Sequence, residues 1–436
     1  MTPAYRRDLS DLLRLATPVV GTRLGIMAMG LTDTVVVGRH STTELGYVAL
    51  GWAPTVVVLT TGIGLLSGVQ VLTARRVGAG RPELAGPVLR RGVIYAFWLG
   101  LVSAMLLAAL GPGFLRLTGV EPDLARGAGR ALTVFSWSLP LALIANAAGT
   151  WLEAVGRPQP AMWAMWGANL VNLVLQLMLV PHLGALGAAY GTAGARLVLV
   201  ASLGLVLVTL RDADRLGLRG PPVLDHGAAA EQRRIGYAAG AAFFAETAAF
   251  SGMNVIAGWI GGLAVAGWAV VLNVAALIFM VPLGLSAAAS VLVARAHGGD
   301  DRHGVARAGA VAFGVTIAFG AAITTLVWAC AGFIASLYTP DPALQAVVAG
   351  ALGLACLFFI ADGLQVVAAH MLRARGDVWM ASAAQILSYA VVMLPLGWAL
   401  GLPAGMGLEG IVWAVVTASL LSASLLVARF WMLSGR

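Results

Sequence analysis

The chain has little charge, two cysteines and no lysine. Only 11% of its 436 residues are charged, whereas 60% are hydrophobic, and the mean hydropathy is +0.89. So little charge cannot cover the surface of a water-soluble domain, so the sequence predicts an integral membrane protein. Cys330 and Cys356 both fall in apolar runs, and we therefore expect neither a disulfide framework nor a cysteine-based metal site. The missing lysine indicates a compositional bias, from which no function follows.

The motifs of soluble enzymes are missing as well. The sequence contains no Walker loop, no dinucleotide-binding fingerprint and no zinc-type spacing of His and Glu. We therefore expect a protein that is not an enzyme and that has no cofactor.

Long apolar runs dominate what is present. About twelve are long enough to cross a bilayer as helices, whereas the strands of a membrane barrel would be short and alternating. The first run is too long for a signal-peptide core, so we expect it to be the first helix. The runs lie near residues 13–37, 46–72, 92–111, 131–153, 161–181, 185–210, 235–260, 264–293, 307–331, 344–372, 378–400 and 408–432.

The arginines are distributed unevenly between the loops. Alternate loops and both termini carry 21 of the 27, and the opposite loops carry only Arg39, Arg116, Arg126 and Arg130. Because positive residues stay on the cytoplasmic side, both termini are predicted to be cytoplasmic, in a multi-pass protein of the cytoplasmic (inner) membrane. The net charge of +8 then indicates contact with anionic membrane lipids rather than with nucleic acid.

A long internal repeat divides the chain. Residues 64–80 and 284–300 share seven identities in seventeen positions, where roughly two would arise by chance. The polar segment 211–234 reads as a cytoplasmic linker between an N-lobe (1–210) and a C-lobe (235–436) of six helices each. An even number of helices gives both lobes the same orientation. The predicted fold is therefore all-α, with two six-helix bundles related by a pseudo-twofold axis along the membrane normal.

Three acidic residues lie inside the predicted spans, namely Asp33, Glu246 and Asp362. A carboxylate near the bilayer centre costs about 2.5–3.5 kcal/mol, so acids at this depth are generally functional. One interpretation is a switch that binds H⁺ or Na⁺ and changes helix contacts. The other is that buried partners neutralise the acids and hold helices together.

Further polar residues share helix faces with these acids. Asp362, Gln365 and Arg373 fall on one face. His370 lies near that face, either as a proton relay or as a side chain that simply forms hydrogen bonds within the bundle. Asn254 lies two turns after Glu246.

A similar stripe is formed by Asn169, Asn172 and Gln176, which could bind a ligand or bridge two helices. Asn169, Asn254, Gln365 and His370 are thus candidates for a substrate cavity or a relay. Homologous halves, buried acids and the missing ATP motif together indicate a secondary transporter that uses an ion gradient.

Several segments resemble the multidrug and toxic compound extrusion (MATE) family of cation-coupled antiporters. The most specific is DGLQVVAAHMLRARGD at 362–377, which is similar to the NorM-like branch, as is Glu246. The others are LTDTVVVGRHSTTELG at 31–46, VQVLTARRVGAG at 69–80, WLEAVGRPQPAM at 151–162, NLVNLVLQ at 169–176 and GALGAAYGT at 184–192.

The resemblance implies two cation sites. Glu246 and Asp362 would form the C-lobe site, where Na⁺ could bind, and Asp33, Asn172 and Thr192 would form the N-lobe site. Two positions depart from the family pattern. Gln176, counted with the N-lobe site, stands where several relatives carry a second Asp, and His370 replaces a residue that is usually small.

The resemblance also implies a function. A monomer would export amphiphilic, often cationic, small molecules in exchange for H⁺ or Na⁺ by alternating access. The alternatives are a lipid-linked oligosaccharide flippase, a metabolite exporter of narrow specificity and a passive channel. A flippase would need a strongly cationic cavity, whereas only Arg23 and Arg196 lie inside the spans.

Overall fold

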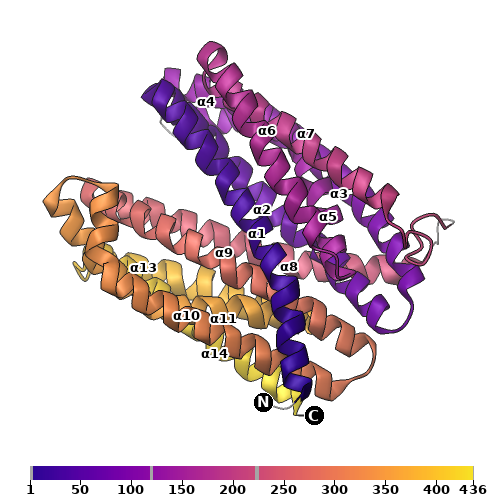
Figure 1. Cartoon of the computed structure of the whole chain (residues 1–436). Coiled ribbons are helices and arrows are strands. Elements are labelled where there is room, and N and C mark those ends of the chain that lie inside the picture. The colour runs from indigo at the N-terminus through magenta and orange to yellow at the C-terminus, as the bar shows by residue number, and fades with distance from the viewer. Residues whose placement is uncertain (1–2, 118–120, 221–224, 436) are drawn as a thin grey trace. The chain divides into compact units, whose positions relative to one another are not determined.

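The computed structural model describes residues 3–117, 121–220 and 225–435, and within them all regular structure is helical. Residues 221–224 of the expected linker and Arg436 lie outside the described residues. A short 3₁₀ turn covers Pro82–Leu84, and a π-helical segment, η2, covers Leu387–Met393. The α-helices (Figure 1) are α1 (Pro3–His40), α2 (Thr42–Gly78), α3 (Ala85–Leu117), α4 (Pro122–Trp137), α5 (Leu139–Ala154), α6 (Gln159–Leu183), α7 (Ala185–Thr209), α8 (His226–Ile260), α9 (Gly262–Gly298), α10 (Arg302–Tyr338), α11 (Pro342–Ala374), α12 (Val378–Ile386), α13 (Leu394–Gly401) and α14 (Gly407–Ser434).

The expected membrane fold is confirmed. Among the described residues, ten spans are long and apolar enough to cross a bilayer, and α12, η2 and α13 together form one of them. Helices α4 and α5 meet at a 40° bend and make an eleventh if they are one span. The remaining expected run corresponds to α8, which is 35 residues long but carries Glu246 and the polar stretch 231–234.

The bend between α4 and α5 has a local cause. Pro140 lies at the second position of α5, where its ring lacks an N–H and clashes with the carbonyl one turn earlier. Helix α4 therefore ends at Trp137, and Ser138 takes the position between the two helices. The bend lies inside the expected run 131–153.

Polar side chains fix the start of several helices. Asp301 accepts a hydrogen bond from the backbone N–H of Gly304 at 2.7 Å, and Asp341 accepts one from Ala343 at 3.0 Å. Ser41 accepts one from Glu44 at the start of α2. These caps satisfy N–H groups that have no partner within the helix.

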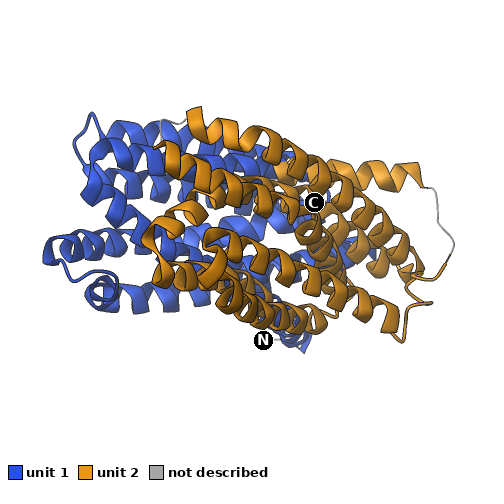
Figure 2. Cartoon of the chain, turned by 90° about the horizontal axis from the view of Figure 1, so that it is seen from above, with its two compact units in different colours: residues 1–20, 241–436 blue, residues 21–240 orange. Residues whose placement is uncertain are grey.

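The described chain divides into two compact units, coloured in Figure 2. We call residues 21–240 the N-terminal unit and residues 1–20 with 241–436 the C-terminal unit. Helices α1 and α8 each pass from one unit to the other, and Pro18 lies just before this point in α1. The expected lobe boundaries at 210 and 235 stay a prediction, although α8 already begins at His226.

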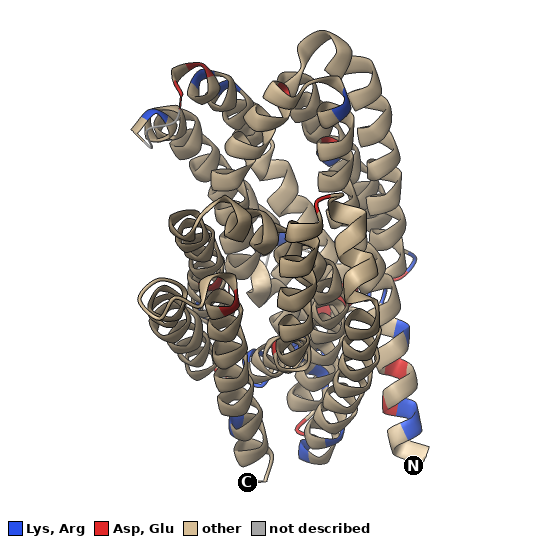
Figure 3. Ribbon diagram, turned by 90° about the vertical axis from the view of Figure 1, so that its left-hand side faces the viewer, with Lys and Arg blue, Asp and Glu red and all other residues tan. Residues whose placement is uncertain are grey.

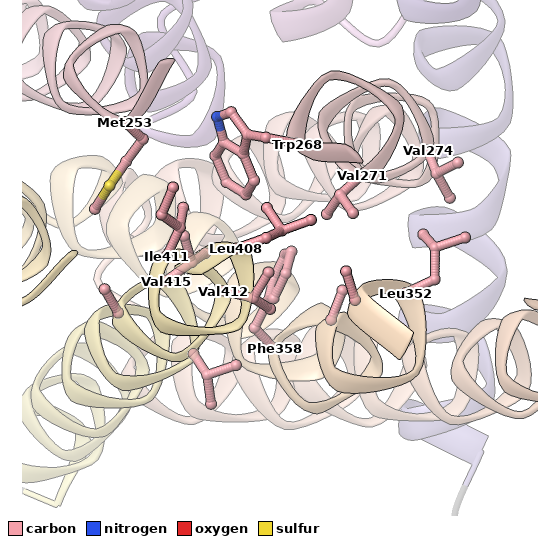
Figure 4. Close-up of a cluster of buried hydrophobic side chains, with 14 of the residues drawn as sticks. Met253, Trp268, Val271, Val274, Leu352, Phe358, Leu408, Ile411, Val412 and Val415 are labelled. Atoms are coloured by element: carbon pink, nitrogen blue, oxygen red, sulfur yellow. The ribbon is translucent and has the colours of Figure 1, made fainter. Parts of the chain in front are cut away.

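In the C-terminal unit, α11 packs against α9, α10 and α14 (Figure 1). Figure 4 shows part of the core that they share with α8: Trp268 of α9, Phe358 of α11 and Leu408 of α14. These side chains are almost fully buried. Because lipid tails are as apolar as this core, close packing rather than exclusion of water holds such helices together.

The N-terminal unit contains a glycine-mediated crossing of α2 and α8. A Cβ atom on Gly236 would overlap the carbonyl oxygen of Leu65, and one on Gly68 would overlap that of Gln232. The two glycines therefore allow the two backbones to touch. Charged residues are sparse along the helices throughout (Figure 3), which matches the low charge of the sequence.

Candidate functional site

Asp33 of α1 is the centre of a polar cluster in the N-terminal unit. Its carboxylate is 8% exposed and accepts hydrogen bonds from three side chains. Asn172 donates at 3.1 Å, Thr192 donates at 3.1 Å to the second oxygen, and the Gln176 amide donates as well. Asn172 and Gln176 belong to α6 and Thr192 to α7, so the Asp33 cluster joins three helices.

The geometry of α6 explains this arrangement. Asn172 and Gln176 are four residues apart and therefore lie on one face, where the Gln176 amide also donates to the Asn172 carbonyl oxygen at 3.2 Å. Asn169, one turn earlier, donates to the backbone oxygen of Gly25 on α1 at 2.9 Å. The stripe thus bridges α6 to α1, and its two later members also reach Asp33.

A buried arginine lies beside this cluster. Arg196 of α7 is 6% exposed, and its charge interacts with that of Asp33. It donates to the Ser138 hydroxyl at 2.5 Å, at the bend between α4 and α5, and it lies 5.4 Å from the centre of the Trp52 ring. Burying a guanidinium is costly unless charge and hydrogen bonds compensate it, and the Arg196 environment supplies both.

Arg196 also lines an open pocket of about 740 Å³ inside the N-terminal unit. Most of its wall is apolar, but Arg23 and Glu153 contribute charge. They form an ion pair at 3.5 Å, and Gln70 donates to Glu153 at 2.7 Å. A mostly apolar pocket with a few fixed polar groups is suited to a small amphiphilic molecule.

The C-terminal unit holds the second acidic site. The side-chain amide of Gln365 lies 3.5 Å from Glu246 Oε1 and 3.5 Å from Asp362 Oδ1. Glu246 comes from α8, and the other two residues come from α11. One amide therefore links two carboxylates, which we call the carboxylate pair.

Three residues complete this site, and the sequence analysis did not assign two of them. The Tyr389 hydroxyl donates to Asp362 at 3.0 Å. Gln385 donates to the Gln365 carbonyl oxygen at 2.9 Å, and Arg373 donates to Gln385 in turn. Gln385 and Tyr389 are four residues apart, so a polar stripe at helical spacing could have revealed them. Tyr389 lies in η2, and π-helical turns often mark functional sites.

The other two predicted residues of this unit are His370 and Asn254. The His370 ring nitrogen Nδ1 contacts the carbonyl oxygen of Val366 on its own helix at 2.8 Å, and the ring packs near Phe243. Asn254 lies on α8 with an exposed side chain. Their roles in a relay or a substrate cavity stay predictions. Among the described residues, no group of three or more His, Cys, Asp or Glu side chains could hold a metal ion.

Comparison with known proteins identifies the family. The family model MatE matches residues 18–178 and 238–399. A probable multidrug resistance protein NorM of Caulobacter vibrioides is 50% identical over 98% of this chain and 92% of its own length. One of Rhodopseudomonas palustris is 32% identical over 98% and 92%.

Solved structures agree in fold. A multidrug resistance MATE family transporter of the MOP superfamily, in an outward-facing conformation, superposes with a TM-score of 0.92 at 19% identity, over 100% of this chain and 98% of the other. The eukaryotic MATE transporter AtDTX14 superposes with a TM-score of 0.91 at 19% identity, over 98% and 96%. The resemblance inferred from the sequence motifs is confirmed, and the chain belongs to the MATE (MatE) family, whose members are membrane transporters and not enzymes.

Proposed function

We propose that the protein exports amphiphilic, often cationic, small molecules in exchange for H⁺ or Na⁺ by alternating access. Its NorM relatives, named as multidrug resistance proteins, support this substrate class. The arginine-rich loops support a place in the cytoplasmic membrane with both termini inside the cell. In this proposal the protein acts as a monomer.

The observation that carries the proposal is the carboxylate pair. Glu246 and Asp362 share one amide donor, so their negative charges repel each other, while the charge of Arg373 attracts Glu246. A proton or a Na⁺ ion, which carboxylate oxygens both accept, would remove this repulsion. A cationic substrate would do the same. Because one pair of carboxylates cannot satisfy both ligands at once, binding of one favours release of the other, which couples their movements.

Asp33 would supply a second switch. Its three neutral donors come from α6 and α7, and each donates a hydrogen bond to the Asp33 carboxylate. Protonation would turn one oxygen of the Asp33 carboxylate into an O–H donor, which then meets the donors of Asn172, Gln176 or Thr192. Their hydrogen bonds would have to rearrange, and α1 would be held less firmly against α6 and α7. Pro18, inside α1, would help that helix to bend.

The test is ethidium efflux from proteoliposomes of the purified protein, with a pH gradient and a Na⁺ gradient imposed separately. Wild type should show efflux under one gradient. Asp362→Asn and Glu246→Gln should each lower the driven rate by about tenfold or more, which is within the usual range of a coupling energy. Glu409→Gln removes an exposed carboxylate of α14 and serves as the matched control, with the rate unchanged.

Wild-type rates in both site variants would contradict the role of the carboxylate pair. Efflux that needs no gradient would instead indicate a passive channel. The flippase alternative is disfavoured because the pocket in the N-terminal unit combines two arginines with a glutamate, whereas a pyrophosphate headgroup would need a strongly cationic cavity.

A further inference from the structure

A second concave surface lies in the N-terminal unit, separate from the pocket that Arg196 lines. It is an open groove of about 750 Å³ between α2, α3 and the first turns of α8. Leu65 and Leu66 of α2 and Ile94 of α3 form its apolar wall, and Arg91 and Arg233 lie on its polar side. We call it the α2–α3–α8 groove. Nothing in the proposed transport cycle uses it.

The two arginines of the groove have hydrogen-bonding capacity left. Arg91 uses its Nε atom to donate to Gln232 at 3.4 Å. In the described part of the chain, its terminal nitrogens and the exposed guanidinium of Arg233 donate no hydrogen bond. A guanidinium is built to bind carboxylate or phosphate oxygens through several N–H groups.

The surroundings of the groove carry an excess of positive charge. Glu231 forms an ion pair with Arg75 at 2.6 Å, and Asp225 forms one with Arg76 at 3.8 Å. Asp225 also attracts Arg91, but Arg233 has no ion pair among the described residues. Arg234, whose charge acts on Arg75, adds a further positive charge. Two carboxylates therefore stand against five arginines, namely Arg75, Arg76, Arg91, Arg233 and Arg234. The groove is thus suited to an anion.

The exposed side chains at the groove indicate a lipid rather than a soluble anion. Ile94 is 60% exposed and Trp98 is 57% exposed, and Tyr95 lies between them on α3. Tyr237 is exposed one turn after Arg233. Tyr and Trp beside arginines, at the end of membrane-spanning helices, are typical of the membrane interface, where headgroups lie.

We propose that the α2–α3–α8 groove binds an anionic phospholipid of the bilayer, with its phosphate between Arg91 and Arg233 and an acyl chain along Leu65, Leu66 and Ile94. Charge complementarity holds the headgroup, and the apolar wall holds the chain. The lipid would join α3 to α8 at the glycine-mediated crossing of α8 with α2. It therefore stabilises the N-terminal unit, independently of whether the transport proposal holds.

The test is thermal unfolding of the full-length protein in detergent with added phosphatidylglycerol or with phosphatidylcholine of the same acyl chains. Phosphatidylglycerol should raise the melting temperature by about 3 °C or more above the effect of phosphatidylcholine, because a ligand stabilises the state that binds it. Native mass spectrometry of the same samples should show preferential retention of phosphatidylglycerol. Both effects should disappear in Arg91→Gln/Arg233→Gln. They should persist in Arg215→Gln, which removes an exposed arginine elsewhere in the unit.

Two further samples keep the result decisive. Arg233→Gln alone changes an exposed side chain, so it should fold and lose part of the lipid effect even if the double variant does not fold. Ile94→Trp narrows the groove at an exposed position and should weaken retention. Equal effects of the two lipids, an unchanged preference in the Arg233→Gln variant, or equal stabilisation by millimolar inorganic phosphate would each overturn the proposal.

Discussion

The two acidic sites differ in what surrounds the carboxylates. Asp33 is a single carboxylate among neutral donors, with Gln176 in contact where a second acid would add charge. Glu246 and Asp362 share the Gln365 amide, and Asp362 has the Tyr389 hydroxyl as a further donor. At the scale of residues, Tyr389 therefore determines how well Asp362 is satisfied without a cation.

Tyr389→Phe tests this role. The substitution removes the hydroxyl but keeps the ring that packs near Phe250, so the protein should still fold. Loss of a hydrogen bond to a charged group costs about 1.5–3 kcal/mol. We expect the rate of driven ethidium efflux to fall by about tenfold. We also expect its dependence on the concentration of the coupling ion to shift. Tyr338→Phe, at an exposed tyrosine, is the control. An unchanged ion dependence in Tyr389→Phe would contradict a role at the cation site.

Much of the N-terminal site could be predicted from the sequence. Spacing on one helix face grouped Asn172 with Gln176, and the family resemblance added Asp33 and Thr192, which lie within hydrogen-bond distance of one another. The sequence analysis did not assign Gln385 and Tyr389, because a hydroxyl or an amide costs less free energy in a membrane than a charge and is therefore a weaker sign of function. Their helical spacing is visible in the sequence, but their contacts with Gln365 and Asp362 of α11 depend on packing that the sequence does not display.

At the scale of elements, the crossing of α2 and α8 depends on two glycines and the bend of α4–α5 on one proline. The apolar runs predicted the number of spans well, because length and hydropathy determine whether a helix can cross a bilayer. They could not locate the break at Ser138 or the π-helical segment η2. Both occur inside long apolar runs, whose length and hydropathy do not mark a change in the backbone.

The crossing predicts a difference between two glycines of the same helix. Gly236→Ala places a methyl group against the backbone of Leu65, whereas Gly258 has no atom within 4 Å of the added carbon. Gly236→Ala should destabilise the protein by about 1–3 kcal/mol, as overpacking commonly does. Gly258→Ala should be neutral or slightly stabilising, because alanine favours helix more than glycine does. The apparent melting temperature in detergent measures both, and equal values for the two variants would show that the crossing tolerates a side chain.

At the scale of the whole molecule, each of the two units contains its own acidic site, buried at Asp33 and partly buried at the carboxylate pair. The 220-residue repeat accounts for two related units, yet the acids do not fall at matching positions in the repeat. The two sites are therefore not copies of one another. We infer that the two sites have different roles, one in binding the coupling ion and the other in changing conformation. The proposed exchange of ion for substrate would require both sites.

The most direct measurement of exchange reverses the driving force. Proteoliposomes loaded with ethidium are diluted into medium without it, and ion movement is followed with an internal pH-sensitive or Na⁺-sensitive dye. Antiport predicts that outward ethidium flow drives inward movement of H⁺ or Na⁺ in wild type and in Glu409→Gln, and that Asp33→Asn and Asp362→Asn abolish it. Ethidium flow with no opposite ion movement in wild type would contradict the account.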